Sequence, residues 1–260
     1  MYTKQDLIDA IIEIGIKPSD TLLIHSSMKA VGQVEGGADT VLDAFTQYLQ
    51  EEGLLIFPTH TWNQMNDSYN LFNPMTEPSC VGILTNLFRK RPGVIRSLHP
   101  THSVAALGKD AKEYTLGEEV FDTPCPRKGC WGKLYDRKAK ILFLGCSLKR
   151  NTFLHGVEEW LQIPNRLGEK PKQLKILLAD GSIIDRPCHP HSSTYGNVSL
   201  NYDKMLAPFL HKKIANEGKI GDAKSFLCDA VGMADLTTKF LKRKPNLFDD
   251  SSPVPEEWYL

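Results

Sequence analysis

The chain has 260 residues, and its 31 lysine and arginine residues are balanced by 31 aspartate and glutamate residues, so its formal net charge is zero. Nucleic-acid-binding proteins usually carry a surplus of basic residues that displaces phosphate counterions, so this balance argues against a nucleic-acid partner. With 41% hydrophobic and 24% charged residues, the composition is that of a globular protein large enough to bury a core without disulfides.

The N-terminal segment, MYTKQDLIDAIIEIG, mixes acidic with apolar residues, which is typical of neither a signal peptide nor a transit peptide. No apolar run approaches the roughly 18 residues that a membrane span needs. The six cysteines are scattered and form no CxxC pair, so we expect reduced thiols. These features predict a cytoplasmic protein without a membrane partner.

Apolar periodicity predicts helices that alternate with short strands along the chain. Thr3, followed three residues later by Asp6, is typical of a helix N-terminus, and KILFLG (140–145) is the clearest buried strand. In chain order we predict a helix over 3–16, a strand over 21–25, a helix over 36–50, a strand over 54–60, a helix over 81–90, strands over 103–107 and 140–145, a helix over 152–162, a hairpin over 172–186, a helix over 202–216, a strand over 219–227 and a helix over 230–242.

This succession indicates an α/β fold, with residues 1–260 forming a single domain around a central mixed sheet flanked by helices. The sheet is expected to be mixed because of the hairpin signal at Asp180-Gly181 and the late strand. The polar stretch 61–78 is long for a connection in a compact domain, which favours an irregular substrate-binding loop. The tail from about residue 245, rich in Asp, Ser and Pro, is expected to be poorly ordered.

Three motifs of common enzyme classes are missing from the sequence. There is no GxGxxG after a strand, no GxxxxGK[ST] and no GxSxG. A dinucleotide site of the Rossmann type, a P-loop and an ordinary α/β-hydrolase serine are therefore not predicted.

The candidate functional residues are histidines near strand ends, where open α/β sheets bind ligands. His155 and Glu158 lie at i and i+3 of a predicted helix, a spacing that lets a carboxylate orient an imidazole as a general base. The same spacing also fits a plain surface pair. The other histidines of this pattern are His25, His99, His102, His189 and His191.

Other uses of these residues stay open at this point. A zinc-dependent hydrolase could be built from four histidines, namely His102, His155, His189 and His191. The CHPHSS run over 188–193 could be a catalytic loop, a metal-binding loop or only a polar loop. Ser26 and Ser27, directly after a buried strand, could offer hydroxyls and backbone N–H groups to an anionic ligand.

Six segments in order resemble the aminoglycoside 3-N-acetyltransferase family, which uses acetyl-CoA and is distinct from the GNAT acetyltransferases. They are HSS (25–27), VEGGADTVLDAF (34–45), FPTH (57–60), RPGVIRSLHPTHSVAALG (91–108), WGKLYDRKAKILFLGC (131–146) and NTFLHGVEEWLQIPNR (151–166). A weaker similarity follows at GKIGDAKSFL (218–227). The resemblance implies transfer of an acetyl group from acetyl-CoA to an amine of an aminocyclitol or amino sugar, as in antibiotic-resistance enzymes, with no metal.

The resemblance also implies roles for individual residues. His155 would be the general base, with Glu158 as its orienting partner or as a contact to the acceptor amine, and His102 is an alternative base. Hydroxyls or backbone N–H groups near Ser103 would stabilise the oxyanion. The residues implied to contact acetyl-CoA are His25, Ser26, Ser27, Met28, Lys29, Val31, Gly32 and Ser103. A CoA-binding protein without turnover is the non-enzymatic alternative.

Two positions depart from the family pattern. Resistance enzymes often carry an acidic residue in the HPTHS region, where this chain has Thr101 and His102, and the often acidic loop after the hairpin reads CHPHSSTYGNV here. Histidines in place of carboxylates match a polycationic aminoglycoside poorly. A mono-amino sugar, a nucleotide-linked amino sugar and a biosynthetic amine therefore stay open as acceptors.

Overall fold

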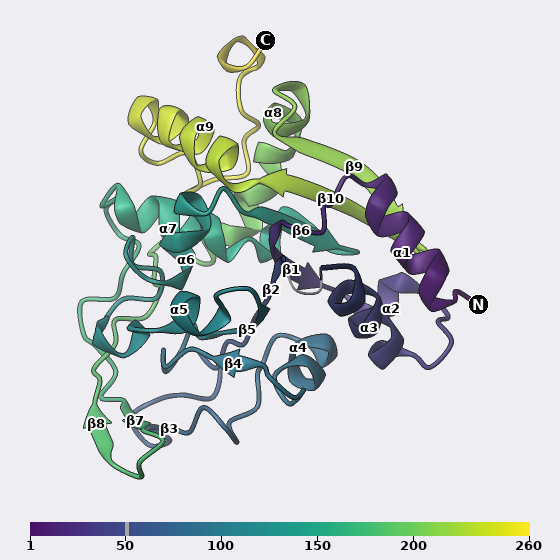
Figure 1. The fold of residues 1–260 in the computed structure, drawn as a ribbon. Coiled ribbons are helices and arrows are strands. Elements are labelled where there is room, and N and C mark those ends of the chain that lie inside the picture. The colour runs from purple at the N-terminus through teal and green to yellow at the C-terminus, as the bar shows by residue number, and fades with distance from the viewer. Residues whose placement is uncertain (50–51) are drawn as a thin grey trace.

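A seven-stranded mixed sheet with the strand order β4-β5-β2-β1-β6-β10-β9 forms the centre of the computed structural model, which describes residues 1–49 and 52–260 (Figure 1). Its strands are β1 (Thr21–Ser26), β2 (Leu54–Pro58), β4 (Ile95–Arg96), β5 (Val104–Gly108), β6 (Lys140–Leu144), β9 (Ala215–Ile220) and β10 (Ala223–Asp229). β1, β2 and β6 are parallel, whereas β5 runs antiparallel to β2 and β10 antiparallel to β6. The predicted α/β class with a mixed sheet is confirmed.

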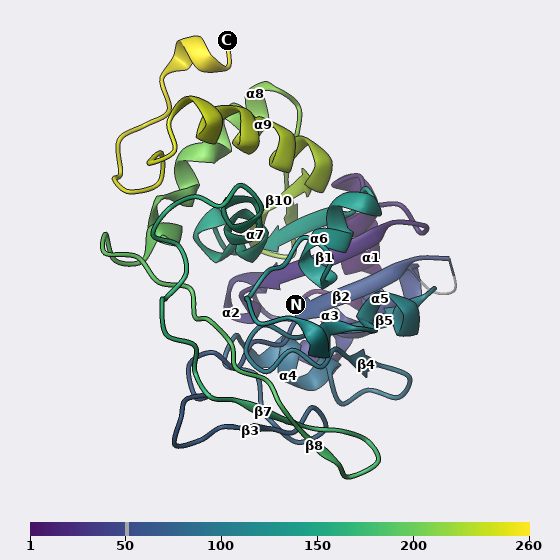
Figure 2. The same cartoon turned by 90° about the vertical axis from the view of Figure 1, so that its left-hand side faces the viewer.

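Helices cover both faces of this sheet (Figures 1 and 2). One face carries α1 (Lys4–Glu13), α3 (Ala38–Leu49) and α4 (Ile83–Phe88), and the other carries α5 (Ala111–Thr115), α6 (Cys130–Asp136), α7 (Thr152–Trp160) and α9 (Ala230–Arg243). Successive strand residues point to opposite faces, so Leu22 and Ile24 pack beneath α1 and α3 while Leu23 enters the other core. Because both faces are covered, the central strands are apolar throughout.

Local signals placed most elements of the first two-thirds of the chain correctly. α1 begins after Thr3, whose hydroxyl accepts from the backbone of Asp6, while the Asp6 carboxylate accepts from the backbone of Thr3. This reciprocal capping box is the reason for the observed helix start. The predicted helix over 36–50 is α3, and its last predicted residue, Gln50, lies outside the described residues.

The segment from 198 to 229 differs from the prediction. A 3-10 segment (Val198–Met205) leads into α8 (Leu206–His211), and the chain then forms the β9–β10 hairpin. The predicted helix over 202–216 and the single strand over 219–227 are therefore wrong in their extent. A turn at Gly221 and Asp222 divides this segment into two strands. Gly221 has φ +60°, and the N–H of Asp222 donates to the carbonyl of Val31.

A second, three-stranded sheet lies beside the main one and joins the predicted hairpin to the loop over 61–78. It consists of β3 (Leu71–Phe72), β7 (Lys175–Leu177) and β8 (Ile183–Asp185), and its small core includes Met65, Phe72 and Leu174. The hairpin is confirmed. The loop is mostly irregular, as expected, except for β3, which was too short to predict.

Part of the C-terminal tail, which the sequence predicts to be poorly ordered from about residue 245, packs against the core. Leu247 and Phe248 are fully buried, and Asp249 forms an ion pair with Arg166 at 2.6 Å. The prediction rested on the polar composition of the tail, but these few apolar side chains anchor it to the core beside α9.

No helix among the described residues is both long enough and apolar enough to cross a membrane. All six cysteines are free thiols, as the sequence predicted.

Candidate active site

A cavity of about 1220 Å³ opens at the edge of the main sheet where the parallel strands β1, β2 and β6 end. Ser26, Pro58 and Gly145 line it from the ends of these strands. β5 is antiparallel to β2, so His102, just before β5 begins, reaches the same edge. This is the edge at which open α/β sheets bind ligands.

Four histidines from distant parts of the sequence pack against one another in the wall of this cavity. Ring centroids lie 4.7 Å apart for His60 and His102, 5.0 Å for His102 and His191, and 4.3 Å for His191 and His155. Burial lowers the pKa of all four rings, to about 3 for His191. The four rings are therefore uncharged near pH 7, and each has an unprotonated nitrogen that can accept a proton.

The His155–Glu158 pair is bridged by a third residue. The His155 Nδ1 and Glu158 Oε2 atoms are 4.0 Å apart, and the Tyr202 hydroxyl lies in contact with both, 2.8 Å from Nδ1. Tyr202 belongs to the 3-10 segment before α8 and is fully buried. The predicted orientation of the imidazole by Glu158 therefore acts through this hydroxyl.

Glu158 is held as a carboxylate by donors on both of its oxygens. Arg166 Nε donates to Oε1 and the Tyr202 hydroxyl donates to Oε2. Burial raises the pKa of Glu158, and the neighbouring Arg166 guanidinium and Tyr202 hydroxyl oppose that shift. Arg166 is in turn held by Asp249 of the C-terminal tail at 2.6 Å. The tail thus supports the base through two successive ion pairs.

These contacts determine which nitrogen of His155 can act as a base. The Tyr202 hydroxyl has one proton, which it donates to the carboxylate, so it accepts a hydrogen bond from the Nδ1–H of His155. Burial also raises the pKa of Tyr202 well above 10, which keeps its proton in place. Nε2 of His155 makes no hydrogen bond within the described part of the chain and carries the free lone pair.

The turn after β1 lines the same cavity. His25, Ser26, Ser27, Met28 and Lys29 all contribute to its wall, as expected from the resemblance. His25 stacks on Phe143 with ring centroids 5.3 Å apart, and its Nε2 has no hydrogen-bond partner among residues 1–49 and 52–260. Burial lowers its pKa to about 3.

Three other residues expected to contact acetyl-CoA lie behind this wall. Val31, the last residue of α2 (Met28–Val31), is fully buried in the core. Gly32 has φ +85°, and a Cβ atom there would lie 2.0 Å from the Asp222 carboxylate, so its role is close packing. Ser103 is also fully buried, and its hydroxyl donates to the Thr59 carbonyl at 2.9 Å. None of the three lines the cavity.

His102 and His60 also line the cavity, and both side chains are buried. The His102 Nδ1 is 3.0 Å from the Thr101 hydroxyl, and its carbonyl accepts from the Trp131 indole. His60 Nε2 is 3.1 Å from the Thr152 hydroxyl at the start of α7. Among residues 1–49 and 52–260, no carboxylate forms a hydrogen bond or ion pair with either ring, in contrast to His155.

The zinc alternative lacks a ligand set. His189 Nδ1 donates to the Gly168 carbonyl at 2.7 Å and does not line the cavity. Within the described ranges, no group of three or more His, Cys, Asp or Glu side chains is placed to hold a metal ion. His155 and His191 stack face to face, and His102 meets His191 edge-on at an interplanar angle of 74°, so contacts between rings hold these histidines together.

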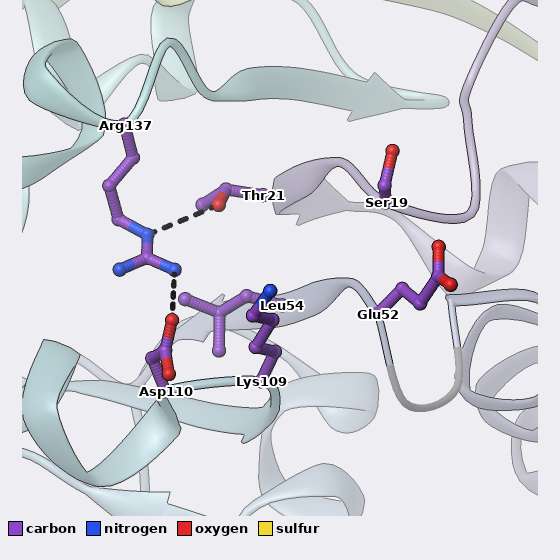
Figure 3. Close-up of a pocket in the computed structure, with 7 residues that line it drawn as sticks. All are labelled: Ser19, Thr21, Glu52, Leu54, Lys109, Asp110 and Arg137. Carbon is purple, nitrogen blue, oxygen red and sulfur yellow. Dashed lines mark hydrogen bonds and ion pairs between the residues drawn. The ribbon is translucent and has the colours of Figure 1, made fainter.

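A smaller pocket of about 470 Å³ lies at the opposite edge of the sheet, where β1 and β2 begin (Figure 3). Arg137 donates to the Thr21 hydroxyl at 3.2 Å and pairs with Asp110 at 3.5 Å. Its charge is already matched, and none of the residues predicted to act in catalysis or CoA binding lines it. The larger cavity is therefore the candidate active site.

Three residues of the site, Arg166, His60 and Tyr202, were not predicted from the sequence. Arg166 ends the NTFLHGVEEWLQIPNR segment, so its place in that motif was an available signal. His60 ends the FPTH segment in the same way. Tyr202 lies 44 residues beyond Glu158 and had no local signal, because only the fold brings it beside His155.

The chain is similar to known aminoglycoside acetyltransferases. The family model described as "Aminoglycoside 3-N-acetyltransferase" matches residues 23–242. The SPbeta prophage-derived aminoglycoside N(3')-acetyltransferase-like protein YokD of Bacillus subtilis (strain 168) is 30% identical over 176 residues, which span 60% of this chain and 64% of that relative. Aminoglycoside N(3)-acetyltransferase VII of Streptomyces paromomycinus is 27% identical, over 93% of this chain and 92% of its own.

Solved structures show the same fold. AAC-IIIb in a binary complex with CoASH superposes with a TM-score of 0.82 at 22% identity, covering 97% of this chain and 99% of its own. The family match spans well over half of the chain, and the resemblance seen in the sequence is confirmed. The chain belongs to the aminoglycoside 3-N-acetyltransferase family, a family of acetyl-CoA-dependent N-acetyltransferases.

Proposed function

We propose that this N-acetyltransferase transfers the acetyl group of acetyl-CoA to an amino group of an aminoglycoside or a related amino sugar, with His155 as the general base. The observation that supports this most directly is the contact of His155 Nδ1 with Tyr202 and, through it, with the buried Glu158 carboxylate. We also propose a cytoplasmic location, which the free thiols support because they suit a reducing compartment.

The cavity has groups that suit acetyl-CoA. Lys29 and Arg150 line it, and neither forms an ion pair with the residues described, so both charges are free for the phosphates. The hydroxyls of Ser26 and Ser27 lie beside them at the end of β1. When bound, acetyl-CoA supplies a thioester whose carbonyl carbon can accept an amine nitrogen.

In the reaction, His155 Nε2 removes a proton from the acceptor amine as its nitrogen bonds to the acetyl carbon and the carbon–sulfur bond breaks. The imidazolium that forms keeps its Nδ1–H bond to Tyr202, and the Glu158 carboxylate behind it balances the positive charge. His155 then returns the proton to the departing sulfur, which leaves as the CoA thiol. Tyr202, Glu158 and Arg166 are positioning residues in this scheme.

The test is titration of CoA into the purified protein, followed by an assay of free-thiol release from acetyl-CoA across a panel of amines. We expect micromolar CoA binding and thiol release that depends on the amine. CoA binding without amine-dependent release would instead favour the CoA-binding protein without turnover. Failure to bind CoA at all would contradict the proposed function.

Replacing Tyr202 with phenylalanine tests the bridge. The ring still packs against His155 and Phe248, with centroids 5.0 and 4.8 Å away, but the bridging hydroxyl is lost. A hydrogen bond to a charged group is worth about 1.5–3 kcal/mol, so we expect kcat to fall about tenfold to a hundredfold with little change in KM.

The matched control is Tyr114→Phe. Tyr114 is also buried and donates to the Cys130 carbonyl at 2.8 Å, but it does not line the cavity. The Tyr114→Phe substitution should lower the free energy of unfolding without lowering kcat. Equal losses of kcat in both variants would show that the Tyr202 effect is only structural.

A further inference from the structure

The charged side chains that line the cavity are all cationic. No carboxylate is found among its described lining residues, whereas several cationic side chains are. The cationic residues are Lys29, Lys149, Arg150, Arg166 and Lys172. Lys149 pairs with Asp203 at 3.6 Å, and Arg166 pairs with Glu158 and Asp249. Lys29, Arg150 and Lys172 form no ion pair with the described residues, so their charges are the ones that a ligand can match.

The carboxylates nearest to the histidines do not offset this charge for a ligand. Glu158 is fully buried and paired with Arg166 behind His155. Glu159 lies behind His191, at 3.9 Å from Nε2, and its oxygens accept from the Thr123 hydroxyl and the Cys125 N–H. Neither carboxylate lines the cavity.

The cations fall on two sides of the cavity. Lys29 and Arg150 follow β1 and β6, next to the turn where acetyl-CoA is proposed to bind. Lys172 comes from the segment before β7, on the side of the loop over 61–78. Its Nζ donates to the carbonyls of Met65 and Trp62, at 2.8 and 3.4 Å, and one of its three donors is left over.

Trp62 lines the cavity beside Lys172 and is 47% exposed. An indole face of this kind packs against the apolar face of a sugar ring, and an ammonium next to it supplies an anion contact. A ligand with several ammonium groups would instead place positive charge against Lys172 with no carboxylate to receive it.

We infer that the acceptor is an amino sugar that carries one amine and a phosphate, with the phosphate bound by Lys172, and that polycationic aminoglycosides are poor substrates. The inference rests on the proposed function and deepens it, because it concerns the acceptor side of the same cavity. A sugar phosphate and a nucleotide-linked sugar share this chemistry.

The test compares three acceptors in the thiol-release assay with saturating acetyl-CoA: glucosamine 6-phosphate, glucosamine and gentamicin. We expect kcat/KM to fall in that order, by about tenfold or more between the phosphate and the polycation. A UDP-linked amino sugar with a free amine, added to the panel, distinguishes a nucleotide-linked acceptor from a simple sugar phosphate. Higher salt should raise KM for glucosamine 6-phosphate and leave KM for glucosamine nearly unchanged.

Lys172→Met should remove the preference for the phosphate by raising KM for glucosamine 6-phosphate about tenfold, while CoA binding is unchanged. Lys170→Met is the matched control, because Lys170 is exposed in the same segment and does not line the cavity. It should behave like the wild type.

The outcomes separate the two proposals. If gentamicin is the best acceptor, or if the preference for phosphate survives in Lys172→Met, the inference is overturned while the acetyltransferase function stands. If no amine stimulates thiol release from the CoA-binding protein, the proposed function itself fails.

Discussion

Replacing His155 with glutamine should lower kcat by about a hundredfold to ten-thousandfold, which is the usual contribution of a positioned general base. Glutamine is close to histidine in volume and can still meet the Tyr202 hydroxyl, but it cannot accept the proton of an amine at Nε2. The CoA dissociation constant should stay within a few-fold of the wild-type value, because the proposed CoA contacts lie at the turn after β1 and at Arg150.

The pH dependence of the residual activity distinguishes a lost base from a damaged site. In His155→Gln the amine must lose its proton to water, so the remaining rate should rise about tenfold per pH unit below the pKa of the acceptor. The wild-type rate should rise less steeply with pH in this range. Burial holds the pKa of His155 well below 6.5, so its Nε2 is unprotonated and can accept the amine proton at neutral pH.

His102→Gln is the matched comparison for His155→Gln, since both histidines line the cavity and the sequence left both open as the base. His102 has no carboxylate behind it, so we expect its replacement to cost less than tenfold in kcat. A larger loss for His102→Gln than for His155→Gln would reverse the assignment.

Acid should destabilise the protein well before its carboxylates titrate. Burial depresses the pKa of five histidines below 6.5, to about 3 for His25 and His191; the other three are His60, His102 and His155. The buried His99 differs, because Cys188 and Glu118 outweigh the effect of burial and raise its pKa to about 9. A histidine with a depressed pKa in the folded state binds its proton more readily in the unfolded chain. Its stabilising effect is therefore complete above about pH 6.5 and is lost as the pH falls toward the folded-state pKa.

The expected size follows from the number of buried rings. Between pH 7.5 and 5.5 each of the five depressed histidines should cost about 1.4 kcal/mol, whereas His99 with its raised pKa should contribute about 1.4 kcal/mol in the opposite direction. The net loss is about 5.5 kcal/mol, which is a large part of a typical free energy of unfolding. For a domain of this size the melting temperature should fall by roughly 10–20 °C. Urea unfolding at several pH values measures both the free energy and its slope.

Two variants check the origin of the slope. His60→Gln retains an amide that can form a hydrogen bond with Thr152 but cannot titrate, so the slope with pH should become shallower by about one-quarter. His211, which is exposed on α8, is the control, and His211→Gln should leave the slope unchanged. Stability that stays flat down to pH 5 would contradict the neutral histidine cluster.

The sequence by itself determined the elements that short-range chemistry specifies. The Thr3–Asp6 capping box, the apolar run of β6 and the Asp180-Gly181 turn each place an element through neighbours a few residues apart. The order of short motifs also indicated the family and directed attention to His155 and Glu158. These signals lie within short stretches of the chain, so they can be recognised from this single sequence.

Only the tertiary structure decided how those residues work together. Glu158 and His155 are too far apart for direct contact, and Tyr202, 44 residues beyond Glu158, closes the gap. Arg166 and Asp249, 83 residues apart, support the carboxylate from a tail whose composition suggested disorder. Val31, Gly32 and Ser103 show the converse, since residues that the resemblance implied to contact acetyl-CoA do not line the cavity. Long-range packing sets which side chains meet and which way they face, and periodicity along the chain carries no information about it.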